Sequence, residues 1–395
     1  MTDPLAVEQA HASGGVPRRG VTIVSGKGAH LFDAAGRRWV DCSAAHGWAA
    51  LGHGHPAVTA AIREQAGRLV MLTESAANDA RAQWFSTLAA FLARDFPADQ
   101  RGALARIAPT NSGAEAIEAA LKFARFRTGR PGILAFSRGF HGRSFGALSA
   151  TAPSPRRDRF APLVPGFAHV PYDDLSSASK GVNDATAAVV VEVIQGEGGV
   201  HEGSTEFLRG LERLCRERGA LLIVDEIQTG FGRTGRWFAS AWHGLSPDIV
   251  VLGKALGGGL PMGAAIWRAE LGGFDPGFHG STFAGAPLVC AASVAALQAM
   301  SDENLAARAQ TLGEHARAEL QAIGGSGLRV VRGRGLMIGL ELKGRVAPVL
   351  DALMDRGVWA LAAGLNVLRL LPPLTIPEAD LAFALGVVRE TLERG

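Results

Sequence analysis

Cysteine, tyrosine and lysine are scarce in this chain of 395 residues, which has only three cysteines and one tyrosine. Cys42, Cys215 and Cys290 are odd in number and far apart, so they predict neither a disulfide framework nor a C-x-x-C site. A reduced cytoplasm is therefore the expected location. No apolar run reaches about 18 residues, and Asp3 and Glu8 interrupt the first twenty, so we expect no membrane span and no signal peptide.

Charge is nearly balanced along the chain, with 40 Lys and Arg against 37 Asp and Glu and a net charge of +3. This balance, without a basic run, argues against nucleic acid and acidic membranes as partners. Hydrophobic residues make up 47% and charged residues 19%, which excludes a disordered protein and leaves room for a buried subunit interface. Any lysine chemistry has few candidates, namely Lys27, Lys122, Lys180, Lys254 and Lys343.

Short apolar runs alternate with helical stretches between about residues 105 and 270. Val189–Val191 and Leu221–Val224 are apolar on both faces, as strands are when helices cover both sides of a sheet. We therefore predict an α/β domain with a mostly parallel sheet. The predicted strands are Ala105–Ala108, Ile133–Phe136, Ala187–Ile194, Leu221–Asp225, Ile249–Gly253 and Met262–Trp267, with helices near 114–127 and 206–218.

The two ends of the chain have other patterns. The first twenty residues predict a flexible arm, and residues 21–41 predict short strands. Further helices are expected near 56–68, 79–93, 286–299, 303–322, 345–356 and 377–393, and further strands at Leu328–Val331, Leu336–Leu342 and Val367–Leu371. The predicted division is an N-terminal arm and small-domain segment at 1–50, a large domain at 51–285, connecting helices at 286–324 and a small α+β domain at 325–395.

Ligands of such sheets bind beyond the carboxyl ends of the strands, where polar residues stand out. Ser112 and Glu115 fit a helix capping box, and free N–H groups beside Gly113 would also seat a phosphate. Asp225 and Glu226 directly follow a buried strand; they point to opposite sides, so at most one faces a given pocket. A buried carboxylate needs a partner, and either a cationic ring nitrogen of a cofactor or a nearby arginine would serve.

Lys254 stands at the end of an apolar strand and precedes a glycine-rich turn. Burial lowers the pKa of a lysine and suits it for Schiff-base chemistry, whereas the alternative is a side chain that extends into solvent. The segment Gly230–Gly235 matches G-x-G-x-x-G but lies too far after its strand for a dinucleotide-binding turn. A phosphate seat, a carboxylate and a lysine together fit pyridoxal phosphate.

With these segments, the sequence resembles the class III, fold-type I, pyridoxal-phosphate-dependent aminotransferases from about Gly26 to Leu392. The resemblance implies an α/β fold with a large domain built on a mostly parallel seven-stranded sheet and a smaller α+β domain. Within that family, the chain is most similar to the acetylornithine and carrier-protein-linked lysine (aminoadipate-semialdehyde) subgroup. The motifs that carry the resemblance are Leu51–Pro56, Asn111–Ala116, Phe140–Arg143, Gln195–Gly199, Val224–Gly230, Gly253–Gly259, His279–Phe283 and Arg369–Leu374.

The resemblance also implies roles for single residues. Lys254 would bind the cofactor covalently and move the substrate proton, and Asp225 would keep the pyridine nitrogen protonated. Arg143 would bind the α-carboxylate of the amino donor, and Arg369 that of glutamate or 2-oxoglutarate once Glu197 releases it. The implied cofactor-binding residues are Gly113, Ala114, Phe140, Asp225, Glu226, Ile227, Gln228, Lys254 and Thr282, and the implied substrate-binding residues are Arg143, Glu197, Ser281 and Arg369.

The implied activity moves a terminal amino group between an N-blocked basic amino acid, carrier-linked lysine or N-acetylornithine, and 2-oxoglutarate, giving a semialdehyde and glutamate. This reaction belongs to lysine or arginine biosynthesis. Thr282 would reach the phosphate in the neighbouring subunit, which implies a homodimer with shared sites, and a carrier-linked donor would add an acidic amino-group carrier protein as a partner.

Three alternatives remain open. A glutamate-semialdehyde aminomutase would need no arginine for glutamate, so Arg369 and Glu197 argue against it. Another ω-amine transaminase would act on ornithine or γ-aminobutyrate. A non-catalytic binding protein would have lost the lysine or the carboxylate, and both Lys254 and Asp225 are present.

A few positions depart from the family pattern and leave substrate preference open. His46 stands where a pocket tyrosine is common, and Ala284 and Ala286 lie in a segment that is often Gly-Gly-Asn-Pro. His53 and His55 form an H-x-H pair, but no acidic ligand is near them in sequence. We therefore predict a structural turn there and no metal site.

Overall fold

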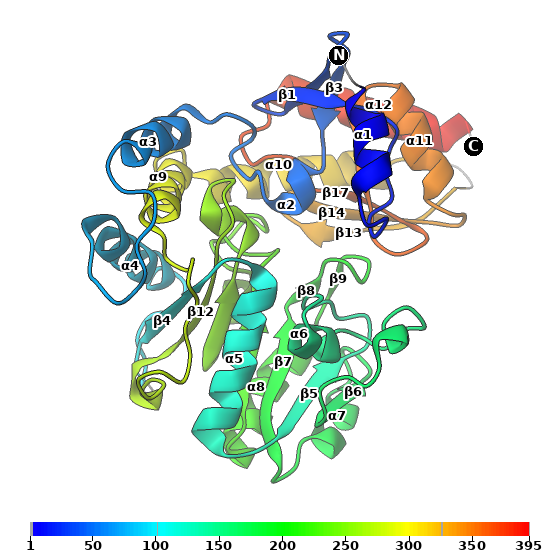
Figure 1. Ribbon diagram of the computed structural model, residues 1–395. Helices are drawn as coiled ribbons and strands as arrows, with labels where there is room; N and C mark the ends of the chain where they lie inside the picture. The colour runs from blue at the N-terminus through cyan, green and yellow to red at the C-terminus, as the bar shows by residue number, and fades with distance from the viewer. Residues whose placement is uncertain (1–2, 101, 325–326, 395) are drawn as a thin grey trace.

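The computed structural model describes residues 3–100, 102–324 and 327–394. The largest sheet in these ranges has seven strands in the order β4-β12-β11-β10-β7-β5-β6 (Figure 1). Its pairs are parallel except for the two that β12 makes, so the sheet is mostly parallel, as predicted. The strands are β4 (Leu104–Thr110), β5 (Gly132–Phe136), β6 (Phe167–Val170), β7 (Thr186–Glu192), β10 (Leu221–Asp225), β11 (Ile249–Leu252) and β12 (Gly263–Arg268).

Helices cover both faces of this sheet, which is why its strands are apolar throughout. Val190 and Ile223 belong to the core that includes α5 (Gly113–Thr128). Val189 and Leu222, one position earlier on the same strands, belong to the core that includes α8 (Thr205–Arg218). Figure 1 shows α5 crossing one face of the sheet. Both helices are confirmed where the sequence predicted them.

Helix α5 begins where the capping box predicted. The Ser112 hydroxyl accepts a hydrogen bond from the Glu115 N–H at 3.2 Å, and the Glu115 carboxylate accepts one from the Asn111 N–H at 3.1 Å. The helix ends at Gly129, whose φ of 66° lies in the left-handed region that glycine adopts without strain. These caps place the first turn of α5 directly after the carboxyl end of β4.

Two smaller sheets lie beyond the carboxyl ends of the large one (Figure 1). One, in the order β1-β2-β3-β15, joins the two ends of the chain, because Val40 pairs in parallel with Val358. The other has the order β13-β14-β17-β16. The division into four segments stays a prediction. The strands are β1 (Ile23–Lys27), β2 (His30–Asp33), β3 (Arg38–Asp41), β13 (Leu328–Arg334), β14 (Met337–Leu342), β15 (Val358–Trp359), β16 (Leu361–Ala362) and β17 (Val367–Leu370).

The six other long predicted helices are present, and some short elements were not predicted. A strand of four half-exposed residues, such as β6, carries too little alternation to stand out. In the described ranges no helix is both long and apolar enough to cross a membrane. The confirmed helices are α3 (Pro56–Ala66), α4 (Asp79–Leu92), α9 (Pro287–Asp302), α10 (Leu305–Gln321), α11 (Ala347–Asp355) and α12 (Glu378–Arg394), and the elements not predicted include α2 (Ala44–Gly47), α6 (Phe145–Ala150), α7 (Leu175–Gly181), β8 (Ile194–Gln195) and β9 (His201–Glu202).

The prediction of a flexible arm over the first twenty residues is wrong in part, because α1 (Pro4–His11) forms there. Asp3 caps this helix, accepting a hydrogen bond from the Leu5 N–H at 3.1 Å, and Pro4 occupies a first-turn position that suits proline. The helix has no buried residue, so local capping rather than packing accounts for it.

Candidate active site

A cavity of about 300 Å³ lies at the carboxyl ends of the large sheet. Most of its lining comes from the last residues of β7 and β10 and from the segments that follow β4, β5, β10 and β11. Parallel topology thus brings together segments that are far apart in sequence. Nine lining residues were predicted for the site, Gly113, Ala114, Phe140, Arg143, Glu197, Asp225, Ile227, Gln228 and Lys254, and six were not, Trp48, Ser112, His141, Gly142, Glu192 and Met262.

Asp225 is oriented by its neighbours. Its Oδ2 lies 2.8 Å from Nδ1 of His141, and its Oδ1 accepts a hydrogen bond from the Ile227 N–H at 3.0 Å. Burial alone would lower the pKa of His141, but the hydrogen bond to Asp225 and its charge outweigh burial and raise that pKa. The two contacts fix the orientation of the Asp225 carboxyl group at the cavity, where it can accept a hydrogen bond from a protonated ring nitrogen.

Glu226 does not line the cavity, so the structure does not support its implied contact with the cofactor. Its carboxylate accepts hydrogen bonds from the Ser240 hydroxyl and N–H, both at 2.7 Å, from the Ala239 N–H at 3.0 Å, and from the Thr229 hydroxyl. Adjacent residues of an extended segment point to opposite sides, and here Asp225 takes the cavity side. Glu226 instead fixes the loop behind the strand.

Lys254 lines the cavity at the end of β11, so it does not simply extend into solvent. Burial lowers the pKa of its amine to about 8, against the opposing charges of Glu197 and Asp225. Its φ of 44° is in the left-handed region, a strained conformation for a side chain of this size. A Cβ on the preceding Gly253 would lie 3.3 Å from the Cα of Gly113, so the lysine segment and the start of α5 pack closely.

The start of α5 forms the part of the cavity best suited to an anion. Gly113 and Ala114 are its first residues, whose N–H groups have no acceptor within the helix. A Cβ on Gly113 would lie 2.8 Å from the Ile227 side chain, so glycine allows the backbone to approach there. With the positive end of the helix dipole, this is the chemistry of a phosphate seat.

Phe140 and Arg143 enter the cavity from the segment after β5. The Arg143 guanidinium lies 5.4 Å from the centre of the Phe140 ring, and Arg143 is otherwise exposed. The Phe140 N–H donates to Oε1 of the buried Glu192 at 2.9 Å. Burial raises the pKa of Glu192, which lies beside Asp225 in the register of the sheet.

Glu197, which lines the cavity and is partly exposed, forms an ion pair with the buried Arg369. Nη1 of Arg369 lies 2.7 Å from Oε1 of Glu197 and 3.1 Å from Oε1 of Gln228. Arg369 is 0% exposed, and within the described ranges its Nε and Nη2 have no hydrogen-bond partner. Burial raises the pKa of Glu197, but the charges of Arg369 and Lys254 outweigh it and hold that pKa at about 2. The guanidinium thus has two donors to spare for another acceptor.

Ser281 and Thr282 do not line the cavity of their own chain. The Ser281 hydroxyl accepts a hydrogen bond from Nδ2 of Asn111 at 2.9 Å, next to the start of α5. Thr282 is exposed. Their roles at a neighbouring subunit therefore stay predictions.

Of the positions that depart from the family pattern, His46 lies near the site. Partial burial lowers the pKa of His46, and the charges of Glu197, Arg369 and Lys254 also act on it. Ala284 and Ala286 are buried.

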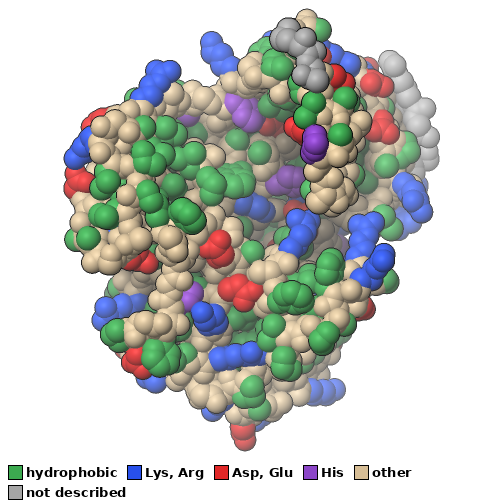
Figure 2. Space-filling model, viewed as in Figure 1, with side chains coloured by type: hydrophobic (Ala, Val, Ile, Leu, Met, Phe, Trp, Pro, Cys, Tyr) green, Lys and Arg blue, Asp and Glu red, His purple; other side chains and the backbone are tan. Residues whose placement is uncertain are grey.

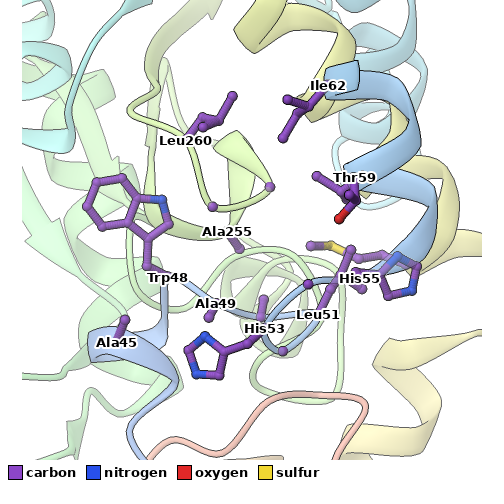
Figure 3. Close-up of a pocket in the computed structure, with 17 residues that line it drawn as sticks. Ala45, Trp48, Ala49, Leu51, His53, His55, Thr59, Ile62, Ala255 and Leu260 are labelled. Atoms are coloured by element: carbon purple, nitrogen blue, oxygen red, sulfur yellow. The ribbon is translucent and has the colours of Figure 1, made fainter. Parts of the chain in front are cut away.

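His53 and His55 have structural partners, since Nε2 of His53 is 2.8 Å from Asp41 and Nε2 of His55 is 3.2 Å from Glu303. They line a second cavity of about 330 Å³, which Trp48 shares with the first (Figure 3). The described residues contain no cluster of three or more side chains arranged to hold a metal.

Two residues that sequence reasoning missed had a signal. His141 lies within a motif that the resemblance used, between Phe140 and Arg143, and Glu192 is the one charged residue of an otherwise apolar strand. A charged residue in a buried strand is rare unless it has a partner or a function, so Glu192 could have been identified as a candidate site residue in the same way as Lys254.

Comparison with known proteins decides the family. Residues 12–392 match the class III aminotransferase family. The chain belongs to the class III aminotransferases. This enzyme family depends on pyridoxal phosphate, and the charge at Asp225, the amine of Lys254 and the start of α5 provide what that cofactor needs.

Relatives of this aminotransferase agree over nearly its whole length. It is 43% identical to the [LysW]-aminoadipate semialdehyde transaminase of Deinococcus radiodurans over 95% of this chain and 87% of the relative. It is 44% identical to the acetylornithine aminotransferase of Methanopyrus kandleri, over 94% of both chains. The crystal structure of the ornithine aminotransferase from Toxoplasma gondii superposes with a TM-score of 0.91 at 33% identity, covering 98% of this chain and 94% of that one.

Proposed function

We propose that this aminotransferase moves the terminal amino group of an N-blocked basic amino acid, either carrier-linked lysine or N-acetylornithine, to 2-oxoglutarate. The products are the semialdehyde and glutamate, and biosynthesis of lysine or arginine uses the reverse direction. The names of the relatives, [LysW]-aminoadipate semialdehyde transaminase and acetylornithine aminotransferase, support this substrate class.

One observation carries the proposal, namely the buried Arg369 with Glu197 on Nη1 and two donors without a partner. A guanidinium grips a carboxylate through two parallel N–H groups. While Glu197 neutralises Arg369, the site accepts a long amine; when Glu197 swings away, Arg369 binds the α-carboxylate of 2-oxoglutarate or glutamate. One cavity thereby serves two unlike substrates.

The remaining residues bind, orient and move a proton. When bound, pyridoxal phosphate supplies an electron sink for the substrate carbon. Asp225, oriented by His141, would keep its ring nitrogen protonated, and Phe140 and Gln228 would hold the ring and its hydroxyl group. The amine of Lys254, with a pKa of about 8, would take the proton from the substrate carbon that carries the amino group.

We also propose a cytoplasmic homodimer, with Arg143 binding the donor's carboxylate and with Ser281 and Thr282 of each subunit serving the other's site. The apolar side chains that Figure 2 shows gathered over α3 and α9 support a subunit interface, as do the exposed Phe278 and Phe283 beside Thr282. If the donor is carrier-linked lysine, an acidic carrier protein is a further partner.

Single-turnover spectroscopy of the cofactor-loaded protein tests the substrate class. N-acetylornithine, carrier-linked lysine, ornithine and γ-aminobutyrate are added separately, and the change of the cofactor from its aldehyde to its amine form is followed. We expect one of the two N-blocked donors to react at least about tenfold faster than the unblocked amines, since one well-placed interaction has that effect. Faster reaction with ornithine, or turnover of glutamate semialdehyde without a second amino acid, would contradict the proposal.

A further inference from the structure

The loop that carries Glu197 joins β8 to β9 and lies against the sheet that carries Arg369. β8 and β9 pair antiparallel, with Gln195 opposite His201. The loop between them consists of Gly196, Glu197, Gly198, Gly199 and Val200. Val200 has a φ of 59°, a left-handed conformation that is rare for a β-branched residue and persists only where the surroundings impose it.

Three residues of neighbouring strands form one row beneath this loop. Arg332 of β13 pairs with Gly339 of β14, and Gly339 pairs with Arg369 of β17. Residues directly opposite each other in antiparallel strands project to the same face, so both arginines project toward the loop. A Cβ on Gly339 would lie 2.8 Å from the Cβ of Val200. Val200 therefore fills the gap that glycine leaves between the two arginines.

The two arginines flank Val200 in space, and each of them binds the loop. Nε of Arg332 donates to the Gly199 carbonyl at 2.8 Å, while Nη1 of Arg369 holds the Glu197 carboxylate at 2.7 Å. Nη2 of Arg332 lies 3.3 Å from Nε2 of His201. Burial and the charge of Arg332 lower the pKa of His201 to about 4, so its ring is a neutral acceptor. Arg332 itself is oriented by Glu341, 2.6 Å from Nη1.

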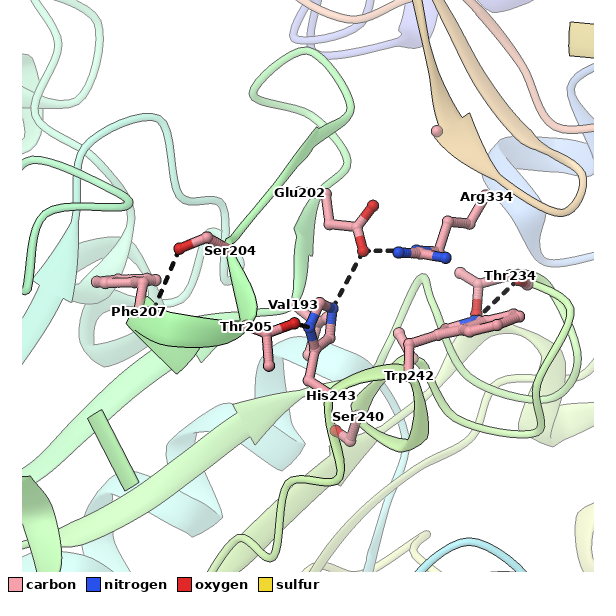
Figure 4. Close-up of polar contacts among 12 residues, drawn as sticks. Val193, Glu202, Ser204, Thr205, Phe207, Thr234, Ser240, Trp242, His243 and Arg334 are labelled. Carbon is pink, nitrogen blue, oxygen red and sulfur yellow. Dashed lines mark hydrogen bonds and ion pairs between the residues drawn. The ribbon is translucent and has the colours of Figure 1, made fainter. Parts of the chain in front are cut away.

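The base of the same loop is fixed by a second arginine of β13 (Figure 4). Nε of Arg334 is 2.5 Å from Oε1 of Glu202, which also lies 3.1 Å from Nε2 of His243. Nδ1 of His243 is 2.8 Å from the Thr205 hydroxyl, so both ring nitrogens are engaged. The segment that follows Glu197 is therefore held to β13 at two points, the Gly199 carbonyl and the Glu202 carboxylate.

We propose that Arg332 and Gly339 are positioning residues that fix the backbone of the Glu197 loop, so that only the carboxylate of Glu197 swings on and off Arg369. This inference rests on the proposed function, because it makes Arg332 control how well the site binds the long amine donor relative to the dicarboxylate. The Gly199 carbonyl is two residues from Glu197, so losing its contact with Arg332 frees the loop without touching the cavity. A free loop leaves Arg369 less often neutralised by Glu197.

The test compares Arg332→Ala and Arg332→Lys with Arg329→Ala. Arg329 is a matched control, because it lies on the same strand and pairs with the same Glu341, 3.7 Å from its Oε1, without contacting the loop. The two half-reactions are followed separately in single turnovers, with N-acetylornithine as donor and 2-oxoglutarate as acceptor. Calorimetry measures binding of glutarate, a dicarboxylate that does not react.

For Arg332→Ala we expect kcat/KM of the donor half-reaction to fall about tenfold, the effect of one lost hydrogen bond to a charged group. Glutarate binds more tightly and KM for 2-oxoglutarate does not rise, because Glu197 competes less for Arg369. Arg332→Lys keeps the charge, so its donor kcat/KM and glutarate affinity should lie between those of Arg332→Ala and the unaltered protein. Arg329→Ala should match the unaltered protein in both quantities.

An equal loss in both half-reactions, weaker glutarate binding, or the same changes in Arg329→Ala would overturn the inference, since each indicates a general structural role. If the unaltered protein reacts with neither N-acetylornithine nor carrier-linked lysine but Arg332→Ala still binds glutarate more tightly, the donor assignment fails and the positioning role stands.

Discussion

Replacing Glu226 tests which of the two adjacent carboxylates faces the cavity. Its carboxylate receives four hydrogen bonds from Thr229, Ala239 and Ser240, all buried. Each buried donor left without an acceptor costs about 1–3 kcal/mol, partly recovered where water enters the space. For Glu226→Ala we therefore expect a loss of about 3–5 kcal/mol in the free energy of unfolding. Glu226→Gln keeps one oxygen and turns an amide toward the Ala239 N–H, so it costs about 1–3 kcal/mol.

Urea unfolding followed by intrinsic fluorescence measures this loss, and the absorption of the lysine-bound cofactor is recorded on the folded protein at low urea. The exposed Glu217 of α8 provides the control, since Glu217→Ala should change stability by no more than about 0.5 kcal/mol. We expect the folded Glu226 variants to bind the cofactor as the unaltered protein does. Unchanged stability together with lost cofactor binding would refute the orientation assigned to Glu226.

Three further predictions concern the cavity. In cofactor-free protein, pyridoxal phosphate should combine with Lys254 faster as pH rises from 7 to 9 and then level off, because only the neutral amine attacks and its pKa is about 8; stopped-flow absorption measures this, and a flat profile would count against the lowered pKa. Asp225→Asn should lower single-turnover rates by about 10²–10⁴, since the amide cannot balance a protonated ring nitrogen, and should cost no more than about 1–3 kcal/mol of urea stability for the altered contact with His141. Arg369→Lys should raise KM for 2-oxoglutarate by about tenfold or more, because an ammonium cannot grip a carboxylate in two-pronged fashion; steady-state kinetics checks this, and an unchanged KM would argue against Arg369 as its ligand.

Much of the large sheet could be predicted because its signals are local. Strands such as β7 and β10 are apolar on both faces, and the capping residues Ser112 and Glu115 mark the start of α5 within five residues of sequence. The opposite orientation of Asp225 and Glu226 also follows from strand geometry alone. The resemblance implies Glu226 as a cofactor ligand, which stays a prediction, whereas in the structure Asp225 lines the cavity and Glu226 does not.

Other features depend on contacts between distant segments and leave little trace in local sequence. Glu197 and Arg369 are 172 positions apart, and nothing near either one indicates that their side chains meet, so only the resemblance implied the pair. The pairing of Val40 with Val358 is likewise set by tertiary structure. Helix α1 does not depend on distant contacts. It was missed because its only signal is the local cap at Asp3, and its residues form no apolar face that would predict a helix.

The central claim, transfer of a terminal amine to 2-oxoglutarate, is tested most directly by following the nitrogen atom itself. N-acetylornithine and carrier-linked lysine, each labelled with ¹⁵N at the terminal amine, are incubated separately with the cofactor-loaded protein and 2-oxoglutarate, and the products are identified by mass spectrometry. The account predicts ¹⁵N-glutamate in amounts equal to the semialdehyde from at least one donor. Label that stays on both donors, or a semialdehyde that forms without labelled glutamate, would contradict it.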